Sequence, residues 1–211
     1  MSYDAVMSSG VTENTPDNIL LGAGTIHKGL EYSSTTKAWN FSESLVGATS
    51  GGNKFSIVPN ILQVEIDGAL VRTKGLDAKT GETAKLETNL IETTPEIINA
   101  SIIGQLGESD VTGYSVIESK ESIDDSDYWP NIAFVGKTIT GKPIIVILDN
   151  AICTSGLELE GKNKESGAGK YTFECAQELT GNLAVLPYHI YYPADESESE
   201  SESESESVSN E

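Results

Sequence analysis

Two histidines and two cysteines are the residues of this chain best suited to nucleophilic or metal chemistry. His27, His189, Cys153 and Cys175 show none of the spacings typical of zinc ligands. Serine and aspartate are also present, but the chain has no Gly-x-Ser-x-Gly sequence and His27 lies in an ordinary strand pattern. The sequence therefore predicts no catalytic residues, no metal and no cofactor, in a protein that is not an enzyme.

Two further motifs bear on ligand binding. Asp124–Asp127 is acidic enough to suggest calcium, but an EF-hand loop counted from Asp125 would need glycine where Pro130 stands and glutamate where Gly136 stands. The glycine-rich stretch 47–55 has an asparagine before its lysine and a phenylalanine in place of the magnesium-binding hydroxyl, and a strand pattern follows it. An acidic turn and a flexible loop are the favoured interpretations.

The chain is strongly acidic, which bears on its partners. Its 211 residues include 33 acidic and 13 basic side chains, a formal net charge of -20. Eight of the carboxylates lie between Asp195 and Glu211, so the preceding residues have 25 acidic against 13 basic side chains, or -12. Proteins that bind nucleic acid phosphates need a basic face, so this balance argues against such binding.

Cellular location is predicted from what the sequence lacks. No signal-peptide pattern is visible at the N-terminus, so we expect synthesis in a cytoplasm, where Cys153 and Cys175 favour two packed thiols over a disulfide. The longest apolar run, 144–148, is too short to cross a membrane, so no membrane anchor is expected.

Most elements that must position these side chains are strands. Apolar and polar residues alternate over 62–67, 84–90 and 171–176, which is typical of strands with one buried face. The continuous apolar run 144–148 is typical of a strand buried on both faces. Together they predict a mainly β protein, a β-sandwich or barrel-like fold.

One short α-helix is expected at about residues 94–106. Thr93-Thr94-Pro95-Glu96 combines a cap, a proline in the first turn and an acidic residue near the helix N-terminus. Ile98, Ile102 and Leu106 recur every four residues, which predicts an apolar stripe that packs on the sheet.

The chain divides into an extended N-terminal arm (1–23), a β-rich domain (24–193) and an acidic Ser-Glu tail (194–211) that we expect to be disordered. Two long loops are expected, at 33–52 and 161–169. Trp39 and Phe41 in the first loop fit either a protein interface or a small hydrophobic cluster beneath the loop.

Several segments resemble the major tail tube proteins of long-tailed, non-contractile bacteriophages of Gram-positive hosts. They occur in the family's order over about residues 14–180, and the Ser-Glu tail lies outside the resemblance. The similar segments are Asn14–Ile26, Leu45–Ile57, Val64–Ala69, Gly75–Asp77, Thr93–Glu96 and Lys170–Ala176.

The resemblance implies a β-sandwich-like tail tube fold with a flanking helix, and six copies that close into a ring. Rings would stack around a tape-measure protein, between the tail terminator and distal tail proteins, as a conduit for DNA. The protein would belong to the virion tail and be assembled in the host cytoplasm. By the same resemblance, segments 1–23, 33–52 and 161–169 would bridge subunits and rings, with Trp39, Phe41, Leu45 and Val46 as contact residues.

A conduit for DNA should not bind its cargo, because carboxylates in the lumen repel phosphate over roughly one Debye length, about 8 Å at physiological salt. Glu65, Asp67 and Glu87 alternate with apolar residues, so we hypothesise that they line the lumen. An ordinary solvated outer face is the alternative for each of them.

Three other functions are compatible with the sequence. One is the tube protein of a contractile tail or related injector, which would need a sheath-binding outer surface. Another is a host-surface or carbohydrate-binding β-sandwich module of a virion, which would need a concave aromatic patch; its candidates are Trp39, Phe41, Tyr128 and Trp129. A hydrolase is the third.

Overall fold

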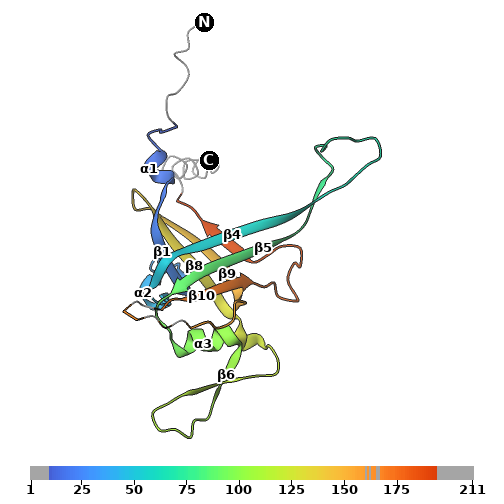
Figure 1. Ribbon diagram of the computed structural model, residues 1–211. Helices are drawn as coiled ribbons and strands as arrows, with labels where there is room; N and C mark the ends of the chain where they lie inside the picture. Colours follow the sequence, from blue (N-terminus) through green and yellow to red (C-terminus); the bar gives the residue numbers. More distant parts are fainter. Residues whose placement is uncertain (1–9, 160, 162, 165–166, 194–211) are drawn as a thin grey trace, which may run out of the picture.

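Seven strands of the chain form one large antiparallel sheet (Figure 1). The computed structural model describes residues 10–159, 161, 163–164 and 167–193. In spatial order the strands are β1 (Leu20–Lys28), β8 (Trp129–Thr138), β9 (Pro143–Cys153), β10 (Gly169–Cys175), β5 (Asp77–Leu90) and β4 (Thr49–Gln63), and β11 (Tyr188–Tyr191) pairs with β9. The predicted mainly β class is confirmed.

Smaller elements surround this sheet. Two short hairpins are formed by β2 (Tyr32–Ser33) with β3 (Ala38–Trp39) and by β6 (Gly104–Gly107) with β7 (Val116–Ser119). The helices are α1 (Thr15–Asn18), α2 (Phe41–Ser44), α3 (Pro95–Ile102) and the 3-10 turn η1 (Asp125–Asp127). The prediction of a single helix was therefore wrong, because two four-residue helices accompany α3.

The large sheet curls until its two outer strands approach each other at one end. The backbone N–H of Val46, just before β4, donates to the carbonyl of Ile26 in β1 over 2.9 Å. The Asn53 side chain donates to the carbonyl of Ala23, also over 2.9 Å. Curling lets one face of the strands enclose a shared core. That core contains Ile26, Ala84, Leu86, Leu90, Ile97, Trp129, Ile132, Phe134, Val146, Leu148, Ala151, Cys153, Tyr171, Phe173 and Cys175.

The predicted alternation is confirmed in β5 and β10. Leu86 and Leu90 of β5 and Tyr171 and Phe173 of β10 are each about 1% exposed, and their polar neighbours point to the other face. The alternation over 62–67 does not mark a two-faced strand, since β4 ends at Gln63 and the apolar residues beyond it are exposed. No layer of the described body covers this part of the hairpin.

Helix α3 begins as predicted and ends earlier than predicted. Thr94 caps it, accepting a hydrogen bond from Ile97 N over 3.3 Å. Ile103 adopts a left-handed φ of 50°, and Gly104 starts β6, where a Cβ would lie 2.9 Å from the carbonyl oxygen of Glu118. The close approach of β7 thus ends the helix four residues before the predicted position.

The buried face of α3 also differs from the predicted stripe. Ile97 and Ser101 are buried, whereas Ile102 is exposed and Leu106 lies on β6 with its side chain in solvent. The four-residue spacing was a correct helical signal for one turn, but it selected the wrong face.

The sheet begins within the segment predicted to be an extended arm. β1 starts at Leu20, and helix α1 precedes it. Asp17 in α1 accepts a hydrogen bond from Thr140 over 2.5 Å and lies 3.6 Å from the ammonium of Lys142. Helix α1 is therefore docked on the turn between β8 and β9, and Leu20 and Leu21 pair with β8. Residues 1–9 and the Ser-Glu tail lie outside the described residues.

Candidate functional site

The most prominent surface feature is the long hairpin of β4 and β5, which projects beyond the body of the molecule (Figure 1). Its strands pair from Asn53 opposite Thr88 to Gln63 opposite Asp77, and a connection over 64–76 closes the end. In the described part of the chain β4 pairs with β5 only, so its outer edge is open beyond the point where β1 approaches. An open edge can accept another strand.

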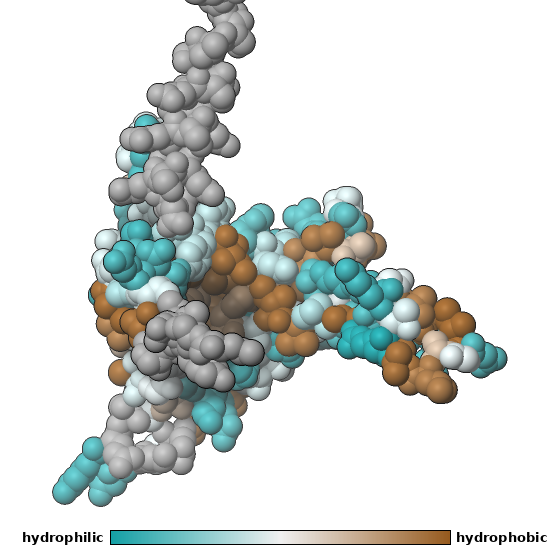
Figure 2. Space-filling view, turned by 90° about the horizontal axis from the view of Figure 1, so that it is seen from above, coloured by the Kyte–Doolittle hydropathy of each residue, from teal (hydrophilic) through white to brown (hydrophobic). Residues whose placement is uncertain are grey.

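The projecting hairpin exposes apolar side chains. Figure 2 shows hydrophobic surface on this part of the molecule. Leu70 is 96% exposed and Val71 is 75% exposed. Clustered exposed apolar residues mark interaction sites more often than scattered ones do. The hairpin's exposed apolar residues are Val58, Ile61, Leu62, Val64, Ile66, Leu70 and Val71.

The structure does not bring the three predicted lumen carboxylates together. Glu65 and Asp67 lie in the connection at the hairpin end, outside any strand, which corrects their assignment to a strand face. Glu87 lies on β5, ten positions beyond Asp77, which is about 33 Å along the strand at 3.3 Å per residue. Periodicity suggested a shared face because it could not show where β4 ends.

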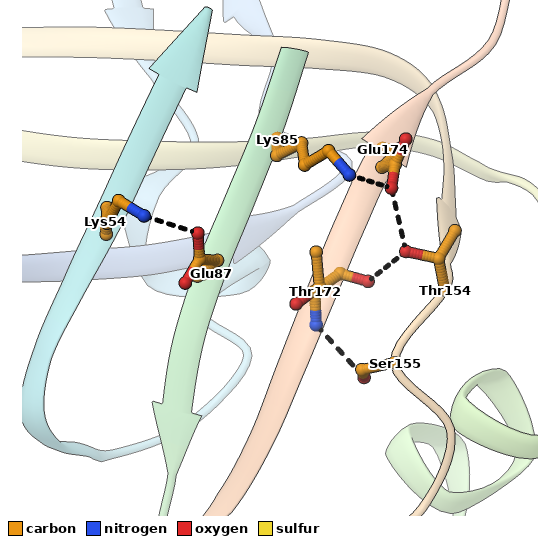
Figure 3. Close-up of polar contacts among 7 residues, drawn as sticks. All are labelled: Lys54, Lys85, Glu87, Thr154, Ser155, Thr172 and Glu174. Atoms are coloured by element: carbon orange, nitrogen blue, oxygen red, sulfur yellow. Dashed lines mark hydrogen bonds and ion pairs between the residues drawn. The ribbon is translucent and has the colours of Figure 1, made fainter. Parts of the chain in front are cut away.

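Glu87 belongs to a polar face of β4, β5 and β10 that points away from the core (Figure 3). Its carboxylate is 2.7 Å from the Lys54 ammonium, and Glu174 is 2.8 Å from that of Lys85. Thr154 donates to Glu174 over 3.1 Å. Lys54 and Lys85 thus balance the two carboxylates, and Lys170 of β10 is exposed on the same face, so this face is polar and has no local excess of negative charge.

The four predicted contact residues of segment 33–52 have different environments. Trp39 and Phe41 pack against the second buried cluster, formed by Leu30, Ala133, Ile145 and Ile147. The cluster beneath the loop, one of the two alternatives for these residues, is therefore confirmed. Val46 packs against the main core, and Leu45 has 51% of its surface exposed. Leu45 is the most exposed of the four, and Trp39 keeps part of its surface exposed where it lines a pocket.

A shallow pocket opens beside Trp39. Tyr32 and Tyr191 contact the Trp39 ring edge to face, with ring centroids 5.3 and 5.0 Å away. The pocket holds about 400 Å³. The full lining is Leu30, Glu31, Tyr32, Trp39, Asn131, Ile147, Asp149, His189 and Tyr191. These residues come from β8, β9, β11 and the segment after β1, so the topology rather than sequence proximity assembles the pocket.

Two carboxylates line this aromatic pocket. Asp149 lies 3.2 Å from Nε2 of His189, and Glu31 has no ion pair among the described residues. Burial raises the pKa of Asp149, and the neighbouring His189 opposes that change. Sequence reasoning missed this pocket. The sequence held two signals for it: the aromatic segment 188–192, which supplies Tyr191, and Asp149, which follows the apolar run 144–148.

A larger open hollow of about 710 Å³ lies on another part of the surface. Its residues come from η1, the end of β9 and the segment after β10: Asp125, Tyr128, Asn150, Ala176, Gln177, Glu178, Leu179 and Thr180. No ring pair and no ion pair is found among these residues. Fewer contacts between side chains therefore fix the lining of this hollow than fix the lining of the aromatic pocket.

His27 forms a buried hydrogen-bonded pair with Ser44. Its Nδ1 is 2.9 Å from the Ser44 hydroxyl, and its Nε2 is 2.8 Å from that of Thr25. Ser44 donates its own proton to the carbonyl of Asn40, so Nδ1 must be the donor to Ser44. Both side chains are almost fully buried, and burial lowers the pKa of His27. The pair joins α2 to β1 inside the protein.

The acidic turn of η1 binds a lysine of the same chain. The ammonium of Lys120 lies 2.8 Å from Asp124 and 2.5 Å from Asp127. Hydrogen bonds from Lys120 and Ser126 lower the pKa of Asp124 to about 2. Asp127 is buried, so the predicted solvated turn is in part an internal ion pair. Among the described residues, no group of three or more His, Cys, Asp or Glu side chains is arranged to hold a metal ion.

Cys153 and Cys175 are both free and buried, as predicted. Burial raises the pKa of the Cys175 thiol to about 11, so its reactive thiolate form is scarce at neutral pH. Both side chains belong to the main core and contribute to packing.

No helix in the described part of the chain is both long enough and apolar enough to span a membrane. Comparison with protein-family models finds no match, and comparison with curated protein sequences finds none either.

Proposed function

We propose that the protein is a structural subunit of a phage tail tube, in which six copies form a ring and stacked rings form a hollow conduit for DNA. The observation that carries this proposal is the β4–β5 hairpin, which projects from the body with an open edge and exposed apolar residues. An isolated two-stranded hairpin with such a surface is a liability in a monomer, and a neighbouring copy would cover it.

Two further features support an assembling subunit. The segments similar to tail tube proteins occur along the chain in that family's order. On the polar face of β4, β5 and β10 Lys54 and Lys85 are paired with carboxylates, which leaves few lysines free to hold DNA as it passes. We propose this face, with Glu87, as the lumen.

The proposed partners follow from this role. They are further copies of the chain, the tape-measure protein inside the tube, and the tail terminator and distal tail proteins at its ends. The proposed location is the tail of the virion, after assembly in the host cytoplasm.

A shortened hairpin tests the proposal. Ile61 and Lys79 are register partners, so replacing residues 62–78 with Asn-Gly would close the hairpin there with a two-residue turn. The main core lies outside this segment, so we expect a folded monomer by circular dichroism and sedimentation velocity. The full-length protein should form tubes under electron microscopy in the same buffer. Tubes from the shortened variant would contradict the proposed role of the hairpin.

One observation favours a second candidate, a carbohydrate-binding module of a virion. Tyr32, Trp39 and Tyr191 form a concave aromatic patch beside Asn131, the arrangement that such a module needs. Of these, only Trp39 was a predicted candidate. A persistent monomer that binds host glycans, and that loses this binding on Trp39→Ala, would favour the module over the tube.

A further inference from the structure

We propose that the hairpin end of one copy binds in the aromatic pocket of a second copy, with the guanidinium of Arg72 against Trp39 and beside the carboxylates of Glu31 and Asp149. The inference rests on the proposed function and names the surface that receives the hairpin.

The hairpin end has the composition of a binding anchor. Arg72 is the only arginine in the chain, and it follows the exposed pair Leu70 and Val71. Its Nε and Nη2 atoms lie 3.2–3.3 Å from Asp77, which leaves the Nη1 donors for another acceptor. Since Leu70 is almost fully exposed, the end does not occupy the pocket of its own chain, and its site must lie on another molecule.

The pocket has the complementary chemistry. Arginine stacks on aromatic faces and pairs with carboxylates through its planar donors, and both partners are present here. Glu31 is exposed and without an ion pair among the described residues, so its carboxylate is available to Arg72 of another copy. Tyr32 and Tyr191 are about half exposed and offer apolar area to Leu70 and Val71.

The two surfaces lie on different elements, so the contact is head-to-tail. Such a contact leaves a free hairpin on one copy and a free pocket on the next, and it repeats as a closed ring or an open filament. Tryptophan, tyrosine and arginine are also the residues that most often dominate binding energy at interfaces. The same contact thus explains how a monomer with an exposed hairpin would continue to assemble.

Charge reversal and rescue test the proposal in the full-length protein. We expect Arg72→Glu to raise the critical concentration for assembly by about tenfold or more, because it places like charges together. Glu31→Arg combined with Arg72→Glu should restore most of this loss. Lys137→Glu makes the same charge change on an exposed position of β8 outside both surfaces, and it should have a much smaller effect. A double variant that assembles no better than Arg72→Glu alone would overturn the proposal.

Cysteine cross-linking tests the geometry independently. Cys153 and Cys175 are buried, so oxidation of a Val71→Cys, Tyr191→Cys variant should report on the introduced pair. We expect covalent oligomers in the assembled fraction, and few from a matched variant with Val71→Cys and Glu87→Cys. If tubes form but the first pair cross-links no better than the control, the pocket is not the receptor and the tube proposal stands. If the unmodified protein does not assemble either, both proposals fail. Glycan binding to assembled tubes gives a further check. If tubes bind a glycan at Trp39, and Arg72→Glu leaves this binding unchanged, the hairpin end does not occupy the pocket and the inference is overturned.

Discussion

At the scale of single residues, His27 shows how a chemically capable side chain is committed to structure. It is held between Ser44 and Thr25 inside the protein, with Nδ1 protonated and Nε2 as the acceptor. A Ser-His contact at this distance would suggest a nucleophile on an open surface. Here both groups are buried, and the serine proton is already donated to the Asn40 carbonyl.

This buried histidine predicts a pH dependence of stability. Because burial lowers the pKa of His27 in the folded state, the unfolded state binds a proton more readily below the ordinary value of about 6.5. The contribution of neutral His27 to the free energy of unfolding should therefore be fully present above about pH 6.5. It should be lost as the pH falls toward the lower pKa of His27 in the folded state. In His27→Gln this component of the fall should disappear when urea unfolding is followed at several pH values.

His189→Gln is the matched control, since it keeps His27 and should retain the component. An unchanged slope in His27→Gln would show that His27 does not titrate as its burial requires.

Sequence reasoning at this scale succeeded where the local pattern determines the environment. The inward residues of β5 and β10 followed from alternation, and the free, buried cysteines matched the expectation for a protein made in a cytoplasm. The aromatic pocket did not, because Glu31, Trp39, Asp149 and Tyr191 are brought together only by the pairing of β9 with β11 and by the fold of the short hairpin β2–β3. Long-range pairing has no signature in a local window.

At the scale of elements, the curl of the sheet depends on how closely β1 packs on β8. The register between these strands shifts between Leu21 and Thr25, and Gly24 lies in that irregularity with a φ of +68°. A Cβ at Gly24 would lie 2.4 Å from the Phe134 ring and 2.8 Å from the carbonyl oxygen of Val135. Glycine therefore permits both the backbone conformation and the contact.

We predict that Gly24→Ala lowers the free energy of unfolding by about 3 kcal/mol or more, because left-handed strain and overpacking act together. Gly22→Ala is the matched control: its φ is +87°, but no atom lies within 4 Å of the added Cβ. It should cost only the conformational strain, about 1–2 kcal/mol. Urea denaturation of both variants measures the difference, and equal losses would show that the Phe134 contact is unimportant.

The elements also show why some boundaries escaped prediction. The start of α3 is encoded locally by Thr94 and Pro95, and it was found correctly. Its end is imposed by the β6–β7 pairing, where only glycine fits beside Glu118, and the sequence pattern continued past it. Likewise the alternation beyond Gln63 resembled a buried strand, although the body does not reach the hairpin end.

At the scale of the whole molecule, charge must be reconciled with assembly. Every copy has a formal charge of -20, and eight of its carboxylates belong to residues 195–211. Copies that approach one another in a ring repel over a Debye length, which is about 30 Å at 0.01 M salt and about 8 Å at 0.15 M. Apolar contacts of the hairpin would have to exceed this repulsion.

We therefore predict that salt promotes assembly, and that removal of residues 195–211 weakens this dependence. The shortened chain has a formal charge of -12, so the critical concentration should fall less steeply as sodium chloride is raised. Sedimentation of both proteins over a salt series measures it. The same slope for both would show that the acidic tail does not contribute to repulsion between copies.

The central claim is that this chain assembles into a hollow tube, and electron microscopy of the purified full-length protein tests it most directly. The account predicts tubes of stacked rings with sixfold symmetry, an open channel, and a neighbouring copy over the β4–β5 hairpin. Monomers at every concentration and salt examined, or filaments without a channel, would contradict it.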